Sequence, residues 1–257
     1  MTGLVDWYAA HGRHDLPWRA TRDPWAILVS EVMLQQTQVS RVLDAWPAFM
    51  AEFPDPATMA AASPGAVIAA WGRLGYPRRA RRLHDAAVVI ARDGWPEDLR
   101  TLPGVGAYTA GAVADQVHDD DLPAVDVNIR RVLERRAGRL LTPKEADLAY
   151  ARTGRPLRGR DRFLAIMDLG AAVCRARDPR CKECPIRRGC ATRGPLVGEV
   201  RTKQAPFEGS FRQRRGRVME RLRAQDAVAV TELDAEALES LVADGLAVVT
   251  RGRASLP

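Results

Sequence analysis

The segment LPGVGAYTAGAV at residues 102–113 places two glycines around one valine, directly before a helix-forming run. Glycine adopts backbone conformations that are closed to other residues, and it lets a ligand come close to the main chain. Gly104 and Gly106 around Val105 therefore predict a tight turn whose amides face outward. The helix that follows adds its free N–H groups and the positive end of its dipole. Such a turn suits a phosphate of a nucleic-acid backbone, and it equally suits a helix–helix turn that binds nothing.

Helical periodicity runs along most of the chain, whereas strand signals are scarce. Apolar residues recur at helical spacing over 25–45, which predicts one long helix. Ser63-Pro64 has the N-cap and the first-turn proline of another helix start. Further helices are expected over 78–93, 106–117, 127–140, 143–153 and 160–174. The linkers between them are short and marked by proline or glycine, so we expect a compact all-α fold.

The composition changes after about residue 191, where a stretch that lacks helical periodicity predicts a linker. Beyond it, residues 210–257 hold a basic helix, an acidic helix over 232–244 and a closing alternation that suits a short hairpin. We therefore expect residues 207–257 to form a small C-terminal module that resembles a winged helix.

The charge of the chain favours a polyanionic partner, though only mildly. The formal net charge is +7 and the isoelectric point is near 9.7. Arginines gather at 73–82 and at 212–223, and each run is explained as well by a solvated helix face. No apolar run reaches the length of a membrane span, and the first residues carry charges where a signal peptide needs an apolar core. A cytoplasmic protein is the expectation.

The four cysteines fall within residues 174–190 and have the spacing C-x6-C-x2-C-x5-C. In a reducing compartment this grouping favours a metal or redox site over disulfides. Four thiolates this close can hold a zinc ion or an iron–sulfur cluster. A zinc site more often has two close pairs, and only one pair is close here, so the spacing separates the two only weakly. The candidate ligands are Cys174, Cys181, Cys184 and Cys190.

Two acidic residues are candidate catalysts. Glu31 lies in the run AILVSEVML, where apolar residues surround it on nearly every side of a helix. A carboxylate there is either paired or has a raised pKa, and a raised pKa is what a general acid requires. A buried structural acid is the alternative. Asp126 stands where a helix begins, and its position alone indicates an N-cap more than a catalyst.

LPGVGAYTAGAV resembles the helix-hairpin-helix motif of the base-excision DNA glycosylases related to endonuclease III. Within that superfamily, EVMLQQTQV at 31–39 resembles the signature of the A/G-specific adenine DNA glycosylases of the MutY type. The motifs LPWR, LGY, VDVNIRRVL and MDLGAAVC follow the family's order, and the resemblance covers roughly residues 5–195.

The resemblance implies two helical lobes. Residues 23–129 would form a six-helix lobe with the helix-hairpin-helix motif, and residues 1–22 with 130–195 would form an iron–sulfur lobe. The cysteine spacing resembles the [4Fe–4S] loop of the superfamily, which favours the cluster over zinc. The expected partner is double-stranded DNA that carries a mismatch or lesion, bound by a monomer in the cytoplasm at the nucleoid.

The resemblance also assigns chemistry to four residues. Glu31 would protonate the target adenine, and Asp126 would stabilise the sugar cation or bond to it transiently before water completes hydrolysis. Asn128 would be a hydrogen-bonding partner of the carboxyl groups. Tyr108 stands where bifunctional relatives have a lysine, and a tyrosine cannot form the Schiff base that leads to strand cleavage. A monofunctional glycosylase is expected.

Further residues match DNA contacts of the family. Gln36 and Thr37 correspond to residues that enter the helix stack near the flipped and opposing bases. Arg19 of LPWR corresponds to a residue near the base pocket. The turn at Gly104, Val105 and Gly106 would take a backbone phosphate. As alternatives, QQTQ could be a polar helix end and Arg19 a surface arginine.

Three departures from the family pattern leave the target base open. Val127 replaces a small or polar residue, Pro77 replaces a tyrosine, and Phe163-Leu164 stand where Asn with Gln or Glu is frequent. About fifty residues follow Phe207, too few for the Nudix-like domain that checks for 8-oxoguanine in such glycosylases. A thymine or uracil mismatch glycosylase is the close alternative, and a non-catalytic DNA-binding module is the alternative of another class. The opposing-base preference and the role of the tail stay open.

Overall fold

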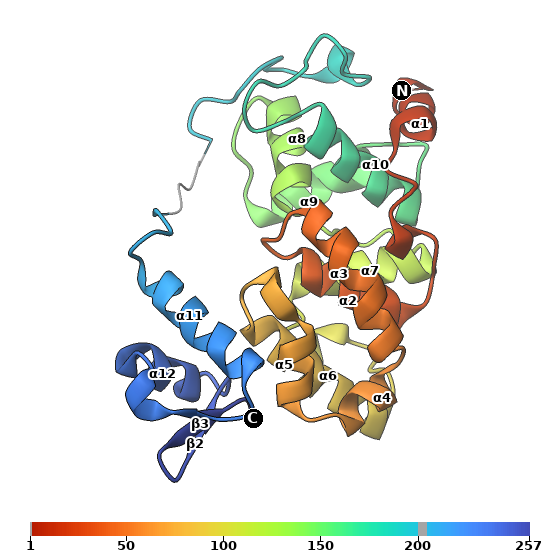
Figure 1. Cartoon of the computed structure of the whole chain (residues 1–257). Helices are drawn as coiled ribbons and strands as arrows, with labels where there is room; N and C mark the ends of the chain where they lie inside the picture. The colour runs from red at the N-terminus through yellow and green to blue at the C-terminus, as the bar shows by residue number, and fades with distance from the viewer. Residues whose placement is uncertain (1, 200–204) are drawn as a thin grey trace. The chain divides into compact units, whose positions relative to one another are not determined.

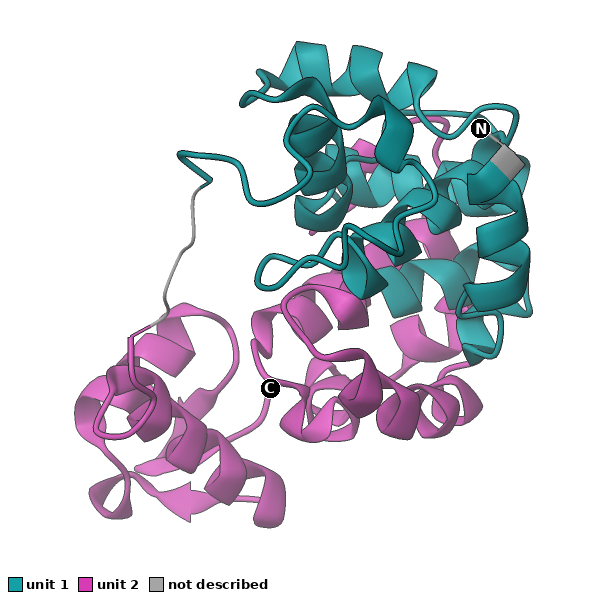
Figure 2. Cartoon of the chain, turned by 90° about the horizontal axis from the view of Figure 1, so that it is seen from above, with its two compact units in different colours: residues 1–31, 105–201 teal, residues 32–104, 202–257 magenta. Residues whose placement is uncertain are grey.

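Helices dominate the part of the chain that the structure describes, residues 2–199 and 205–257, in a computed structural model of the protein (Figure 1). The expected helical fold class is confirmed. The residues gather into two compact units, drawn in teal and magenta in Figure 2. The first comprises residues 1–31 and 105–201, and the second comprises residues 32–104 and 202–257. Within the described ranges, no helix has the length and apolar character to cross a membrane.

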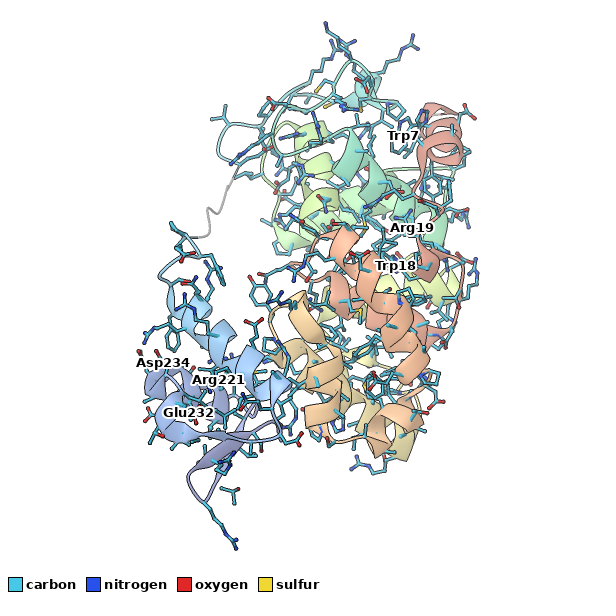
Figure 3. All side chains as sticks on the ribbon, viewed as in Figure 1. Trp7, Trp18, Arg19, Arg221, Glu232 and Asp234 are labelled. Atoms are coloured by element: carbon cyan, nitrogen blue, oxygen red, sulfur yellow. The ribbon has the colours of Figure 1, made fainter. Side chains whose placement is uncertain are left out.

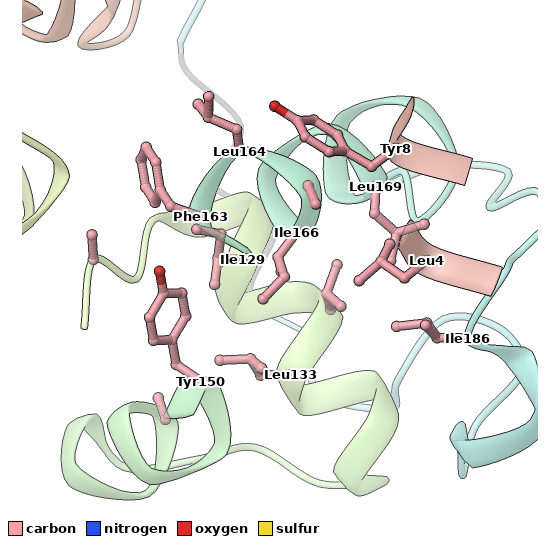
Figure 4. Close-up of a cluster of buried hydrophobic side chains, with 14 of the residues drawn as sticks. Leu4, Tyr8, Ile129, Leu133, Tyr150, Phe163, Leu164, Ile166, Leu169 and Ile186 are labelled. Carbon is pink, nitrogen blue, oxygen red and sulfur yellow. The ribbon is translucent and has the colours of Figure 1, made fainter. Parts of the chain in front are cut away.

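The helices of the first unit surround one apolar core. They are α1 (Thr2–His11), η1 (Pro17–Arg19), α7 (Ala107–His118), α8 (Val127–Ala137), α9 (Pro143–Arg152), α10 (Gly159–Ala172) and η4 (Arg187–Gly189), and α2 (Pro24–Leu34) begins in this unit. α10 packs against α7 and α8, and α1 packs on α10. Leu4, Ile129, Tyr150, Phe163 and Leu169 belong to the core (Figure 4).

Side-chain caps fix where two of these helices begin. At α9, the Glu145 amide donates to the Thr142 hydroxyl while the Thr142 amide donates to the Glu145 carboxylate, which is a capping box. At α8, the carboxylate of Asp126 accepts from the amides of Asn128 and Ile129. The N-cap interpretation of Asp126 is therefore correct, and it leaves open what else that carboxyl does.

The second unit contains helices that flank its longest one. They are α3 (Val39–Glu52), α4 (Pro56–Ala61), α5 (Pro64–Ala70), η2 (Gly72–Leu74), α6 (Arg78–Asp93) and η3 (Leu99–Thr101). α6 packs against both α4 and α5. The Ser63 hydroxyl accepts from the Ala66 amide and caps α5 at the predicted place, directly before Pro64.

The prediction of one long helix over 25–45 is wrong. The chain forms α2 and α3 with a break between Leu34 and Val39, although apolar residues continue at helical spacing across it. Gln36 has a φ of +55°, a left-handed conformation that ends a right-handed helix. The carbonyl groups freed by the break are bonded by the side chain of Arg79 from α6, which a periodicity argument cannot foresee.

The C-terminal segment of the second unit combines helices with a small antiparallel sheet. Its elements are α11 (Phe211–Ala224), β1 (Val228–Ala229), η5 (Val230–Glu232), α12 (Ala235–Ala243), β2 (Val248–Thr250) and β3 (Arg253–Ser255). The strand order is β1-β3-β2, with Ala254 of β3 opposite both Val228 and Val249. The hairpin expected at the end of the sequence is β2–β3.

Most arginines of the basic run at 212–223 contact other residues of this C-terminal segment. On α11, Arg214 pairs with Asp234 and Glu236, and Arg221 bonds Glu232 over 2.5 Å (Figure 3). Arg215 pairs with Asp244 at 2.6 Å. Acidic side chains of the same segment therefore neutralise three arginines of the basic run, whose face is paired and not simply solvated.

The same segment is bonded to α5 and α6 of its unit. The Gly65 amide donates to the carbonyl oxygen of Pro257 over 2.6 Å, and the Arg223 guanidinium donates to the carbonyl oxygen of Ile68. From α6, Arg78 pairs with Asp244 and Arg81 donates to the carbonyl oxygen of Gly245. These contacts account for the grouping of the C-terminal segment with residues 32–104.

Candidate active site

Glu31 lies on α2 and is 5% exposed, so its carboxyl is shielded from water. Burial raises its pKa to about 7, because the charged form loses hydration. Hydrogen bonds from Gln116 and Tyr108 and the charge of Arg19 oppose that rise, whereas the charge of Asp126 adds to it. A carboxyl with this pKa exchanges a proton near neutral pH, as the sequence predicted for a general acid.

α7 supplies both side chains that bond Glu31. The Gln116 Nε2 donates to Glu31 Oε1 over 2.8 Å, and the Tyr108 hydroxyl forms a second hydrogen bond to the same carboxyl. Burial raises the pKa of Tyr108 well above its usual range, so its hydroxyl stays protonated. Its ring stands 6.4 Å from that of Phe163, centroid to centroid, on α10. Tyr108 therefore packs as an aromatic side chain and also acts on the acid.

Asp126 is held by three donors at the start of α8. Its Oδ1 accepts from the Asn128 and Ile129 amides over 2.9 and 2.7 Å, and its Oδ2 accepts from Asn128 Nδ2 over 2.7 Å. Burial raises the pKa of Asp126 above its usual value, and these hydrogen bonds oppose the rise. The charge of Asp126 acts on Glu31, so the structure brings together the four residues predicted to share the chemistry.

Arg131 connects this turn to the first cysteine. Its Nη2 donates to Asn128 Oδ1 over 2.9 Å and to the Gly170 carbonyl oxygen over 2.6 Å, and its Nε donates to the Cys174 carbonyl oxygen over 2.6 Å. The orientation of Asn128, and through it of Asp126, therefore depends on where α10 ends and the cysteine segment begins.

Arg19 is a buried ion-pair partner of Asp168. Its two terminal nitrogens donate to the two carboxylate oxygens of Asp168 over 2.7 and 2.8 Å, a bidentate pair. Arg13 donates to the same carboxylate from its backbone and side chain. The alternative of a free surface arginine is excluded, and the charge of Arg19 also lowers the pKa of Glu31.

The glycine turn has the open backbone that its sequence predicted. Gly104 has a φ of +79°, and an added Cβ would lie 2.9 Å from the Cβ of Arg82. Gly106 is exposed, an added Cβ would meet nothing within 4 Å, and no side chain among the described residues caps α7 there. Val105 is buried and anchors the turn. The first amides of α7 are thus open to an anion.

Gln36 and Thr37 lie in the break between α2 and α3, and Arg79 holds that break. Gln36 is exposed, and Thr37 is half-buried. The buried Arg79 guanidinium donates to Thr37 Oγ1 over 2.9 Å and to a set of carbonyl oxygens, those of Val32, Met33, Gln35, Leu74 and Gly75. Burial lowers the pKa of Arg79 to about 10. QQTQ therefore follows the end of α2 as a loop that Arg79 holds in place.

All four cysteines line one small hollow. Arg135, Arg187 and Arg193 line it with them. Within the described ranges, no three Cys, His, Asp or Glu side chains are arranged closely enough to ligate an ion as they stand. The donor set nonetheless fits an iron–sulfur cluster, because four thiols face a common space and cations neutralise the thiolates. Arg135, which is 1% exposed, donates to Cys174 Sγ over 3.6 Å and pairs with Glu199.

The family departures fall into two environments. Phe163 and Leu164 are buried in the core, whereas Val127 is 75% exposed beside Asp126. Pro77 is the N-cap of α6. The preceding Tyr76 is exposed on a backbone with a φ of +48°, and the guanidinium of Arg79 lies 5.5 Å from its ring centre. Of these departures, Phe163 and Leu164 are the ones that add apolar side chains to the core.

Sequence reasoning missed Gln116, Arg79 and Arg131. Gln116 follows an aspartate on a helix of mixed composition, and no local pattern distinguishes it from a surface residue. Arg79 and Arg131 each belong to arginine-rich stretches that were interpreted as a charged face or left unassigned. A usable signal was the helical wheel of α7, which puts Gln116 about two turns after Tyr108 and so near one face of the helix.

Known proteins resemble this chain in sequence and in fold. Residues 29–151 match the family described as HhH-GPD superfamily base excision DNA repair protein. The adenine DNA glycosylase of Mycobacterium tuberculosis is 45% identical over 100% of this chain and 93% of that protein. A thermostable thymine-DNA glycosylase has a TM-score of 0.66 and 27% identity over 74% of this chain and 93% of its own.

Endonuclease III in a non-covalent complex with DNA shares the fold, with a TM-score of 0.64 and 19% identity over 75% of this chain and 92% of its own. The helical fold agrees with these similarities. With a relative at 45% identity that is matched along nearly its whole length, the chain belongs to the adenine DNA glycosylases of the HhH-GPD superfamily of base excision DNA repair proteins.

Proposed function

We propose that this enzyme removes adenine mispaired with 8-oxoguanine or guanine from double-stranded DNA and leaves the strand intact. The reaction is hydrolysis of the N-glycosidic bond, the chemistry of a base excision repair glycosylase. The observation that carries the proposal is Glu31, an acid buried in an apolar helix and held by two hydrogen bonds with a pKa of about 7. The identity to adenine DNA glycosylases supports the choice of base.

Glu31 acts first, as the general acid. The target adenine leaves the duplex and enters the site, because its glycosidic bond cannot be reached inside the helix. The protonated Glu31 carboxyl donates its proton to the base at N7, which makes adenine a better leaving group. The bond to C1′ then breaks and leaves cationic character on the sugar.

Asp126 stabilises that cation. Its carboxylate is fixed by donors from Asn128 and Ile129, so its orientation needs no rearrangement as positive charge develops. Water then adds to C1′ and completes hydrolysis, the two-carboxyl logic of glycoside hydrolysis. Tyr108 contributes no amine, so no Schiff base forms and no direct strand cleavage follows.

DNA is held through the glycine turn and the loop after α2. The open amides at Gly104, Val105 and Gly106 take a backbone phosphate, and Gln36 and Thr37 contact the bases near the lesion. Arg19, bound to Asp168, lines the base pocket. The chain acts as a monomer in the cytoplasm, at the nucleoid.

The cysteines hold a [4Fe–4S] cluster. Cys174, Cys181, Cys184 and Cys190 would be its ligands, and a bound cluster would fix the cationic segment around it. We assign 1–22 with 130–195 to the cluster lobe, 23–129 to the six-helix lobe and 207–257 to a winged-helix-like module. Protein purified anaerobically without tags or added metal should be yellow-brown with broad absorbance in the visible blue. A colourless protein with stoichiometric zinc would contradict this assignment.

A thymine or uracil mismatch glycosylase is the second candidate, favoured by the likeness to a thymine-DNA glycosylase. Duplexes with adenine opposite 8-oxoguanine or guanine, and with thymine or uracil opposite guanine, separate the two under single-turnover conditions. Strand breaks seen only after alkali indicate base removal without lyase activity. We expect breaks at adenine only. Release of thymine or uracil with none of adenine would reverse the order of the candidates, and no release from any duplex would indicate a binding module.

A further inference from the structure

Gln116 places an amide side chain at a buried position where packing alone would favour an apolar one. Its side chain is 0% exposed on α7. Its Nε2 donates to Glu31 Oε1 over 2.8 Å and to the Ala112 carbonyl oxygen over 3.2 Å, and its Oε1 has no partner among the described residues. Burying an unpaired amide oxygen is unfavourable, so an apolar side chain would stabilise the fold more. The contact with Glu31 accounts for the amide.

The second partner of Gln116 fixes the orientation of its amide. A backbone carbonyl oxygen can only accept, so the atom that faces Ala112 is the NH₂ group. That group has two hydrogens, one for Ala112 and one for Glu31 Oε1. The Tyr108 hydroxyl also bonds Glu31, but a hydroxyl donates or accepts and imposes no choice between the two oxygens.

We propose that Gln116 is a positioning residue that decides which oxygen of Glu31 carries the catalytic proton. In a protonated carboxyl the carbonyl oxygen is a better hydrogen-bond acceptor than the hydroxyl oxygen. The Gln116 NH₂ group therefore favours Oε1 as the carbonyl oxygen, and Oε2 carries the hydrogen that the base receives. The inference rests on the proposed role of Glu31 as the general acid.

The pH dependence of base release follows from the same contact. The titratable and charged groups that act on Glu31 are Tyr108 of α7, Asp126 at the start of α8 and Arg19 of η1. Gln116 donates to the carboxyl and so favours its ionised form. A general acid loses activity as the pH rises through its pKa, and removing the donor moves that loss to higher pH.

The test is the single-turnover rate of base release from pH 5 to 9 for wild type and Gln116→Leu, which removes the amide with little change in volume. We expect the alkaline limb of the pH–rate profile, where the rate falls with rising pH, to move up by about one pH unit. The rate at the optimal pH should fall about tenfold to a hundredfold. Tyr150→Phe is the matched control, because it removes a buried hydroxyl that bonds Asp115 and not Glu31. Its alkaline limb should not move.

Gln116→Glu provides a second variant if Gln116→Leu does not fold. It keeps the shape, and a second carboxyl beside Glu31 should also move the limb upward, since two neighbouring carboxyls share a proton. An unchanged limb, or a rate that falls equally at every pH, would overturn the positioning role. In a Glu31→Gln background, adding Gln116→Leu should change the rate little. If Glu31→Gln alone is as fast as wild type, the proposed function fails and this inference falls with it.

Discussion

Charged side chains serve the active site and the C-terminal segment in opposite ways. Around Glu31 the charges are buried, and burial moves the pKa of the acid toward neutrality. In the C-terminal segment the same residue types stand at the surface and pair with one another, as Arg221 of α11 does with Glu232 of η5. Burying an acid moves its pKa toward the pH at which it can exchange a proton. Pairing two charges at the surface changes the free energy of unfolding only slightly. Effects of substitution should therefore differ greatly between the two regions.

The largest effect is expected at Glu31. Glu31→Gln removes the proton donor with little change in volume, and base release should fall at least about a hundredfold to ten-thousandfold. DNA binding should persist, because the side chain is buried and makes no phosphate contact in the proposed function. Single-turnover kinetics and a binding titration on one duplex measure both. A variant with wild-type rates would remove Glu31 from its role and weaken the contrast between the two regions.

Asp126→Asn should follow, with a loss of about a hundredfold to a thousandfold in the chemical step. Asparagine is also a favoured N-cap, so α8 should start in the same place and the melting temperature should change little. This variant separates the two roles of Asp126, because only the negative charge is removed. A large loss of thermal stability with an unchanged rate would make the residue a cap alone.

Asp115 gives a smaller, pH-dependent effect. It is fully buried, and burial raises its pKa to about 6, against hydrogen bonds from Tyr150 and the Leu122 amide. Between about pH 4 and 6 this carboxyl binds more protons in the folded state than in the unfolded state, so its contribution to the free energy of unfolding falls as the pH rises through this window. Asp115→Asn removes that contribution. In denaturant titrations at pH 4, 5 and 6, the stability of the variant relative to wild type should rise with pH, and parallel profiles would count against a neutral Asp115.

The smallest effect is expected at the surface. Arg221→Ala breaks its pair with Glu232, both partly exposed, and should change the free energy of unfolding by less than about 1 kcal/mol. Added salt should shrink the difference further. Differential scanning calorimetry at low and high salt would measure it. A loss comparable to that of a core substitution would mean that the surface pairs hold the segment together, and the contrast would fail.

The sequence predicted what depends on local pattern. The caps at Ser63 and Asp126, the helical class and the glycine turn all arise within a few residues, and the structure has them where they were expected. The cysteines were found by spacing, and they line one hollow.

What sequence reasoning could not predict depends on contacts across long separations. The break at Gln36 interrupts an unbroken apolar period, and it is stabilised by Arg79 from another helix. The hydrogen bond between Gln116 and Glu31 joins residues 85 positions apart, and no sequence pattern near either residue predicts it. The use of the arginines on α11 likewise depended on where an acidic helix would pack.

α7 carries Tyr108 in its first turn and Gln116 eight positions later, and both reach the same carboxyl of Glu31. A single inserted or deleted residue between them would rotate Gln116 by about 100° around the helix axis and shift it by about 1.5 Å. Substitutions along this stretch can be absorbed by repacking, but a change in its length cannot. The number of residues between Tyr108 and Gln116 is therefore fixed by the site. We expect insertions and deletions to be tolerated least in this stretch, even at positions whose side chains touch nothing in the site.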